Sequence, residues 1–136
     1  MKITTPLRSA IAQDILDAIA AGTTNPNPVI EIYTGTTMPD FGEPIIDTLL
    51  GTLTLTAGVG SVSDGVLTFD TITEDSAADA SGDAFWCRAL DRDGTEAVYF
   101  SISDNAGSGD IKFNTVSIVA GAPIAIASLS VTIGGA

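Results

Sequence analysis

The sequence predicts a mainly β protein, an antiparallel β-sandwich or barrel with one N-terminal α-helix. Three observations predict this fold class. After residue 28 the chain consists of short runs rich in β-branched or alternating apolar residues, turn residues separate these runs, and no helical pattern alternates with them. The chain has 136 residues, of which 45% are hydrophobic, so it can form one core, and we expect a single domain over residues 1–136.

The helix is predicted over about residues 6–21. Thr5 is a suitable cap, and Pro6 suits the first helical position because the N–H that proline lacks has no partner there. Apolar residues then recur at every fourth position and form a stripe, which Leu16 widens: Leu7, Ile11, Ile15 and Ile19. We expect this stripe to be covered, either by a sheet or by a neighbouring subunit.

Strands are predicted from about residue 28 onward. The expected ranges are 29–34, 49–56, 66–73, 84–91, 95–103, 111–114, 116–119 and, as a long last strand, 123–133. Residues 58–65 are predicted to form a turn region. The Asp-Arg-Asp-Gly run at 91–94 predicts a hairpin, because Asp-Gly tolerates the positive φ of a tight turn.

A long irregular loop is predicted between the first two strands, over residues 35–46. It contains two prolines, two glycines and an isolated Phe41. Long loops are uncommon in compact domains and are often functional. Two interpretations stay open: the loop folds Phe41 into the protein's own core, or it is an arm that contacts a partner.

The charge of the chain restricts its partners. It has 17 acidic and 5 basic residues and a net charge of −12. We expect no direct binding to nucleic acid or to a membrane, because binding to phosphates depends on Lys and Arg, whereas docking onto a basic partner is permitted. No stretch approaches the roughly 20 apolar residues that span a bilayer, and the first residues lack the apolar core of a signal peptide. The sequence therefore predicts a soluble protein made in the cytoplasm.

No catalytic or cofactor chemistry is predicted. The chain has no histidine, which excludes Ser-His-Asp and Cys-His arrangements and imidazole metal ligands. Cys87 is expected to be a small buried hydrophobe. The glycines match no nucleotide-binding pattern. Acidic residues within 74–83 and 91–93 leave a calcium ion as an alternative, although their spacing does not fit an EF-hand. We expect no enzyme, no cofactor and no metal.

Five segments, in this order, carry a resemblance to a known family: the helix at 7–14, the strand and turn at 31–36, the strand at 49–55, and the segments 80–88 and 113–124. Together they span nearly the whole chain and consist of strand and turn patterns. This arrangement is similar to that of small head proteins of tailed bacteriophages, the capsid cement or decoration proteins, which have a jelly-roll-like fold.

The resemblance implies a non-enzymatic protein that binds the outside of the mature head and bridges neighbouring major capsid proteins, adding its binding energy to the stability of the shell. It also implies a location on the capsid exterior of the virion. The expected partners are the major capsid protein and a second copy of the chain, most simply in a two-fold dimer. The expected contact residues are Lys2, Ile3, Leu7, Arg8, Met38, Pro39, Phe41 and Pro44.

Two other functions stay open. The chain could be a component of a phage tail, baseplate or fibre, which strand content does not distinguish from a cement protein. It could also be a carbohydrate-binding adhesin module on the same sandwich plan, which would need an exposed aromatic platform or a calcium loop.

Overall fold

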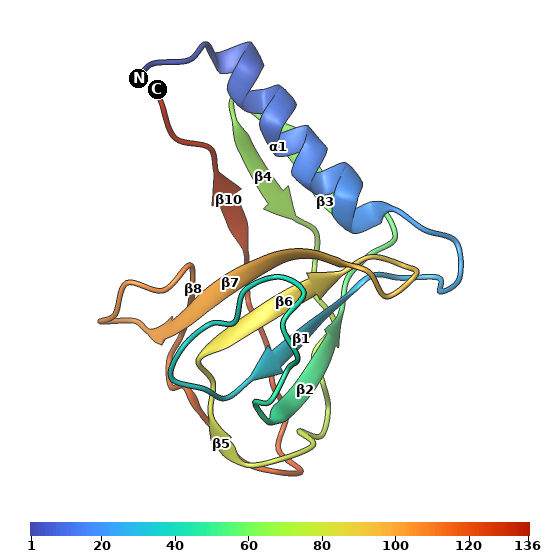
Figure 1. The fold of residues 1–136 in the computed structure, drawn as a ribbon, viewed down its shortest axis with the longest axis vertical. Helices are drawn as coiled ribbons and strands as arrows, with labels where there is room; N and C mark the ends of the chain where they lie inside the picture. Colours follow the sequence, from blue (N-terminus) through green and yellow to red (C-terminus); the bar gives the residue numbers. More distant parts are fainter.

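A computed structural model describes residues 1–136 and is mainly β, with one N-terminal helix, α1 (Thr5–Ala20) (Figure 1). Ten strands follow. They are β1 (Val29–Tyr33), β2 (Leu49–Thr54), β3 (Gly60–Ser63), β4 (Val66–Phe69), β5 (Gly82–Asp83), β6 (Trp86–Leu90), β7 (Glu96–Asp104), β8 (Ile111–Phe113), β9 (Ser117–Ile118) and β10 (Ser130–Thr132). No helix of the chain combines the length and the apolar character needed to cross a membrane.

Helix α1 begins one residue earlier than expected. Thr4, and not Thr5, is the cap: the Thr4 hydroxyl accepts a hydrogen bond from the backbone N–H of Leu7 at 3.3 Å. Thr5 is the first helical residue, and its hydroxyl accepts from the Arg8 guanidinium at 2.9 Å. The prediction of Thr5 as the cap is therefore wrong by one position, because both threonines precede Pro6 and only the structure distinguishes them.

The buried face of α1 matches the expected stripe only in part, at Leu16 and Ile19. The fully or nearly buried residues are Ala12, Leu16 and Ile19, and the helix packs against β3, β4 and β7. Leu7 and Ile11 remain 48% and 37% exposed. Residues four apart are offset by about 40° around a helix of 3.6 residues per turn, so a strict period of four winds away from the buried face.

The largest sheet has the strand order β2-β1-β6-β7-β8. Its first four strands are antiparallel, but β8 runs parallel to β7, which departs from the expected antiparallel pairing. Strands β6 and β7 form the predicted hairpin, closed by the hydrogen bond from the Asp91 N–H to the Thr95 carbonyl at 2.9 Å. Gly94 in this turn has φ +81°, as the Asp-Gly pair indicated.

Two smaller sheets complete the fold, with strand orders β10-β4-β3 and β5-β9. Residues 58–65 are not only a turn, since they contain β3, which joins β4 through Asp64 and Gly65, both with positive φ. The prediction of one long last strand over residues 123–133 is also wrong. Only β10 is paired there as a strand, while Ile124 forms an isolated bridge with Asp75. Burial alternates from Pro123 to Ala127, where the chain bends, so the predicted strand pattern does not hold over the whole segment.

A single cluster of 24 buried residues joins the helix to the sheets. The inner face of the largest sheet supplies Ile30 and Ile32 from β1 and Cys87 and Ala89 from β6, all 0% exposed. Burial raises the pKa of the Cys87 thiol to about 12. The prediction of Cys87 as a buried hydrophobe is confirmed, and no polar or charged residue is buried in this core.

Candidate functional site

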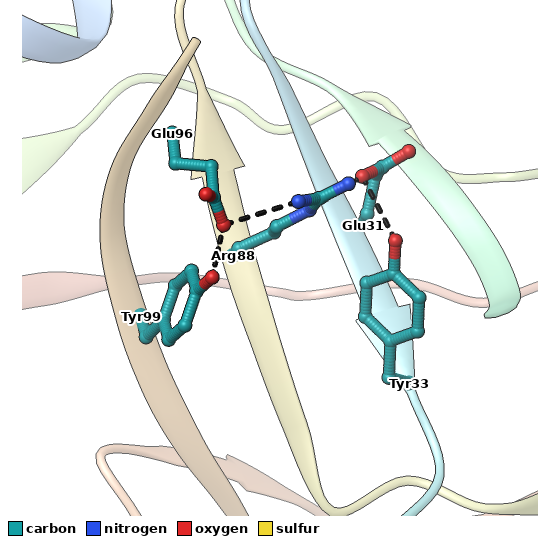
Figure 2. Close-up of polar contacts among 5 residues, drawn as sticks. All are labelled: Glu31, Tyr33, Arg88, Glu96 and Tyr99. Atoms are coloured by element: carbon teal, nitrogen blue, oxygen red, sulfur yellow. Dashed lines mark hydrogen bonds and ion pairs between the residues drawn. The ribbon is translucent and has the colours of Figure 1, made fainter. Parts of the chain in front are cut away.

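The candidate site is the outer face of the largest sheet, which points away from the core. Side chains two residues apart share a face of a strand. The register places Glu31 of β1 beside Arg88 of β6, and Arg88 beside Tyr99 of β7. Tyr33 and Trp86 form the neighbouring pair on the same face. Figure 2 shows the polar members of this group, whose side chains point toward one another across the three strands.

Arg88 is held between two carboxylates. Its Nε lies 2.8 Å from Glu31 Oε1, and its Nη1 lies 3.1 Å from Glu96 Oε2 (Figure 2). Tyr33 donates its hydroxyl proton to Glu31 at 3.1 Å, and Tyr99 donates to Glu96. Both carboxylates of this network therefore share one guanidinium, and the network fastens β1, β6 and β7 together.

The pKa values of the network reflect this pairing. Burial opposes the charge of Arg88, but hydrogen bonds and attraction from Glu31, helped by Glu96, outweigh it and raise the pKa of the guanidinium. The hydrogen bond from Tyr99 lowers the pKa of Glu96. Burial, together with that same bond, raises the pKa of Tyr99 to about 12. Burial and the nearby Glu31 charge raise the pKa of Tyr33.

Aromatic rings surround the ion network. Tyr33 stacks on Trp86 with ring centroids 4.7 Å apart, and Trp86 lies 5.0 Å from Tyr99. The Arg88 guanidinium lies 5.6 Å from the centre of the Tyr33 ring. Tyr33 and Trp86 are only 5% and 0% exposed, although they lie on the outer face of the sheet. A further segment of the chain must therefore cover them.

The segment that covers them is the covering loop, residues 35–47, which crosses in front of β1 and β6 (teal in Figure 1). Its base is closed by the hydrogen bond from the Thr34 N–H to the Thr48 carbonyl at 3.1 Å. Asp47 accepts a hydrogen bond from the Trp86 indole at 2.9 Å. Phe41 packs on Tyr99, with the two ring centroids 4.3 Å apart. The loop is thus fastened to the sheet at both ends and near its middle.

Gly35 permits this close attachment. Its φ is +147°, and a Cβ there would lie 2.8 Å from Asp47 Oδ2. A side chain at this position would therefore displace the carboxylate that accepts the hydrogen bond from the Trp86 indole. The loop also bears two exposed apolar side chains, Phe41 at 62% and Ile46 at 92%, which we name the loop patch. The interpretation that Phe41 folds into the core is wrong.

A cleft of about 340 Å³ adjoins the loop patch. Pro39 and Pro44, both expected contact residues, line it together with Glu43, Ile46 and Asp47. Met38 is half-buried and does not line the cleft. Sequence reasoning missed Ile46, which stands at the end of the predicted loop. An apolar residue two positions after Pro44 and outside any strand pattern was the available signal.

The other expected contact residues lie at the chain ends. Lys2 is exposed, and the Ile3 N–H donates to the Gly135 carbonyl at 2.8 Å, which ties the two termini together at one end of the molecule (Figure 1). Arg8 is half-buried against Gly65, where a Cβ would lie 2.8 Å from the Arg8 Cβ. Leu7 is exposed.

Met1 is also exposed at this end, and so is Ile11, one helical turn after Leu7 on α1, which belongs to the predicted apolar stripe. We name the exposed apolar side chains here, Met1, Leu7 and Ile11, the terminal patch. The structure therefore divides the expected contact residues into two groups. One is at the joined termini, and the other is on the covering loop over the sheet (Figure 1).

The acidic segments considered for calcium have other contacts. Asp75 accepts hydrogen bonds from the N–H groups of Thr52 and Ala77. Asp93 accepts from the N–H groups of Thr23 and Thr24, both at 2.9 Å, which lowers the pKa of its carboxyl. No three His, Cys, Asp or Glu side chains gather in a geometry that could hold a metal ion.

Comparison of the chain with protein-family models, with curated proteins and with solved structures gives no match. The function is therefore inferred from the residues and geometry of the chain itself.

Proposed function

We propose that this protein is a non-enzymatic cement protein of a tailed-bacteriophage head. It binds the outside of the mature capsid and bridges neighbouring major capsid proteins. The observation that carries the proposal is the pair of separate apolar patches on a small, strongly acidic protein. A protein that clamps two neighbours needs two contact surfaces, and the terminal patch and the loop patch supply them.

Each patch is presented by an element that is itself anchored. Leu7 and Ile11 lie one helical turn apart on α1, whose opposite face is buried against three strands. Phe41 is held from below by Tyr99, so one face of its ring is packed and the remainder is available to a partner. Anchored contact residues lose little conformational freedom on binding, which favours affinity.

The net charge of −12 supports docking onto a basic surface. Complementary charge accelerates encounter and is weakened by salt. Because a cement protein binds the assembled shell and not its separated subunits, the free energy of binding adds to the stability of the shell. Repetition of weak contacts over many copies strengthens the total effect.

The finer fold and assembly belong to the same proposal. We infer that the five-stranded and three-stranded sheets are the two layers of a jelly-roll-like sandwich, and the shared core cluster with residues of both sheets supports this. We also infer that two copies associate in a two-fold dimer, which would let one assembly span a symmetry axis of the shell.

The carbohydrate-binding alternative has less support. An aromatic platform for sugars needs neighbouring rings open to solvent, whereas beside the exposed Phe41 the rings of Trp86 and Tyr33 are 0% and 5% exposed beneath the covering loop. The tail, baseplate or fibre alternative is separated from the cement proposal by the location of the protein on phage particles.

The test mixes the purified protein with mature heads that lack it, and measures co-sedimentation and the temperature of DNA release. Saturable binding at a fixed ratio to the major capsid protein, with a raised release temperature, is expected. Absence of binding to heads would contradict the proposal. Binding to tails alone would favour the tail alternative.

A further inference from the structure

We propose that the cleft of the covering loop binds a partner protein segment in which an apolar side chain is flanked by Lys or Arg. This inference rests on the proposed function, and it names the chemistry of the surface that the loop patch would meet. It is carried by a preformed cleft that the strongly exposed Ile46 lines, by the exposed Phe41 of the same loop, and by loop carboxylates that form no ion pair within the chain.

The apolar part of the surface is Ile46 and Phe41, which are 92% and 62% exposed. Ile46 also lines the cleft of about 340 Å³, beside Pro39 and Pro44. An apolar side chain of a partner that enters this cleft would remove Ile46 from water, which is favourable in proportion to the area buried.

The charged part of the surface is Asp40, Glu43 and Asp47. Glu43 and Asp47 line the cleft, and the Glu43 N–H donates to the Asp40 carbonyl at 3.2 Å, so that one tight turn presents both Asp40 and Glu43. Both ion pairs of the chain belong to Arg88, which Glu31 and Glu96 hold on the sheet. The carboxylates of the loop are therefore available to a cation from outside.

The cleft is formed before any partner binds. The hydrogen bond from Trp86 to Asp47, the packing of Phe41 on Tyr99 and the bond between Thr34 and Thr48 fix the loop to the sheet. A surface that is already ordered avoids much of the entropy loss that opposes association.

The negative charge of the surface around the cleft determines which kind of partner can bind there. A second copy of this chain would bring another −12 charge and only 5 basic residues to an acidic surface. Nucleic acid and anionic lipid would be repelled in the same way. A protein segment that combines Lys or Arg with an apolar residue matches both parts of the surface.

The test is an NMR titration of the ¹⁵N-labelled full chain with the peptide Lys-Leu-Lys-Phe-Arg. Two control peptides are Lys-Gly-Lys-Gly-Arg, which keeps the charge, and Glu-Leu-Glu-Phe-Glu, which keeps the apolar residues. We expect amide shifts concentrated in residues 36–47 with the first peptide, and weaker or absent shifts there with both controls. Shifts spread evenly over the acidic surface would overturn the inference.

Variants of the chain locate the binding energy. Asp40→Asn with Glu43→Gln is expected to weaken peptide binding about fivefold to tenfold, since each exposed ion pair contributes modestly. The matched control, Asp64→Asn with Glu74→Gln, removes the same charge from exposed positions elsewhere and is expected to change binding less than twofold. An equal loss of peptide affinity in the two double variants would mean that only the net charge of the protein affects binding. This result would overturn the inference.

The apolar contribution is tested by Ile46→Ser, with Val119→Ser as its control because Val119 is also exposed, at 60%. Ile46→Ser is expected to weaken peptide binding and the control is not. These titrations need no capsids. Failure of the wild-type protein to bind heads would therefore contradict the proposed function, whereas failure of localised peptide binding would contradict this inference alone.

Discussion

The two faces of the largest sheet are buried by different means. The inner face, with Ile30, Ile32 and Cys87, is apolar and lies against the core. The outer face, with Arg88 and Trp86, carries charge and aromatic rings and is covered by a single loop of the same chain. Many apolar contacts stabilise the inner face together. The outer face depends on a few specific hydrogen bonds, ion pairs and ring contacts. Variants should therefore separate the two faces.

The largest expected effect is on the inner face. Ile32 is 0% exposed, so Ile32→Ala should destabilise the protein by about 3 kcal/mol through lost burial and the cavity that remains. Ile46→Ala is the control, since Ile46 is 92% exposed and should cost less than about 0.5 kcal/mol. Denaturant unfolding measures both. Similar costs for the two variants would contradict the burial described here.

On the outer face, Arg88→Met should cost about 2 kcal/mol, because it leaves Glu31 and Glu96 without their shared cation. The cost is less than for a fully buried ion pair, since the Arg88 side chain is 19% exposed. Adding Glu31→Gln should recover part of the loss. Lys112→Met, which removes an exposed cation, is the control, and a loss equal to that of Arg88→Met would show that the network is not responsible.

The attachment of the covering loop should contribute less. Asp47→Ala removes the acceptor of the Trp86 indole proton and should cost about 1 kcal/mol. Trp86 is the only tryptophan of the chain, so quenching of its fluorescence by acrylamide measures how well the covering loop shields it from solvent. Quenching should increase in Asp47→Ala and stay unchanged in Asp40→Ala. Unchanged quenching in both variants would mean that the loop remains closed without this bond.

The smallest effects concern pH. The pKa of Glu96 is lowered in the folded protein, so its stabilising contribution is present above its ordinary pKa and is lost as the pH falls through the lowered value. The pKa of Tyr99 is raised to about 12, so its contribution is present below its ordinary pKa of about 10 and is lost as the pH rises from there to about 12.

Unfolding measured across these two ranges, with Tyr99→Phe for comparison, checks this pH dependence. The alkaline loss of stability should become smaller in Tyr99→Phe. If the variant and the wild-type protein lose the same stability between about pH 10 and 12, the titration of Tyr99 is not the cause.

Local patterns predicted much of the fold. The helix, the hairpin at Asp91–Gly94 and most strands of the largest sheet were expected, because periodicity and turn residues act over short distances. Strand β3 was missed because glycines flank it, although Asp64-Gly65 is itself a hairpin signal. Residues 123–129 were assigned to a strand because their pattern predicts an extended chain, whereas pairing depends on a partner strand elsewhere.

The candidate site was predicted only in part. The loop and Phe41 were named from prolines, glycines and an isolated aromatic residue. The network of Glu31, Arg88 and Glu96 was not, because it exists only once the register of β1, β6 and β7 is known. Opposite charges in the middle of two predicted strands were the one available signal.

The central claim is that one copy bridges neighbouring capsid proteins through two patches. Electron cryomicroscopy of mature heads saturated with the protein tests it most directly. The expected result is a density for each copy on the outside of the shell, with the terminal patch and the loop patch touching different capsid subunits. Absence of that density, or a copy that touches a single subunit through one patch, would contradict the claim.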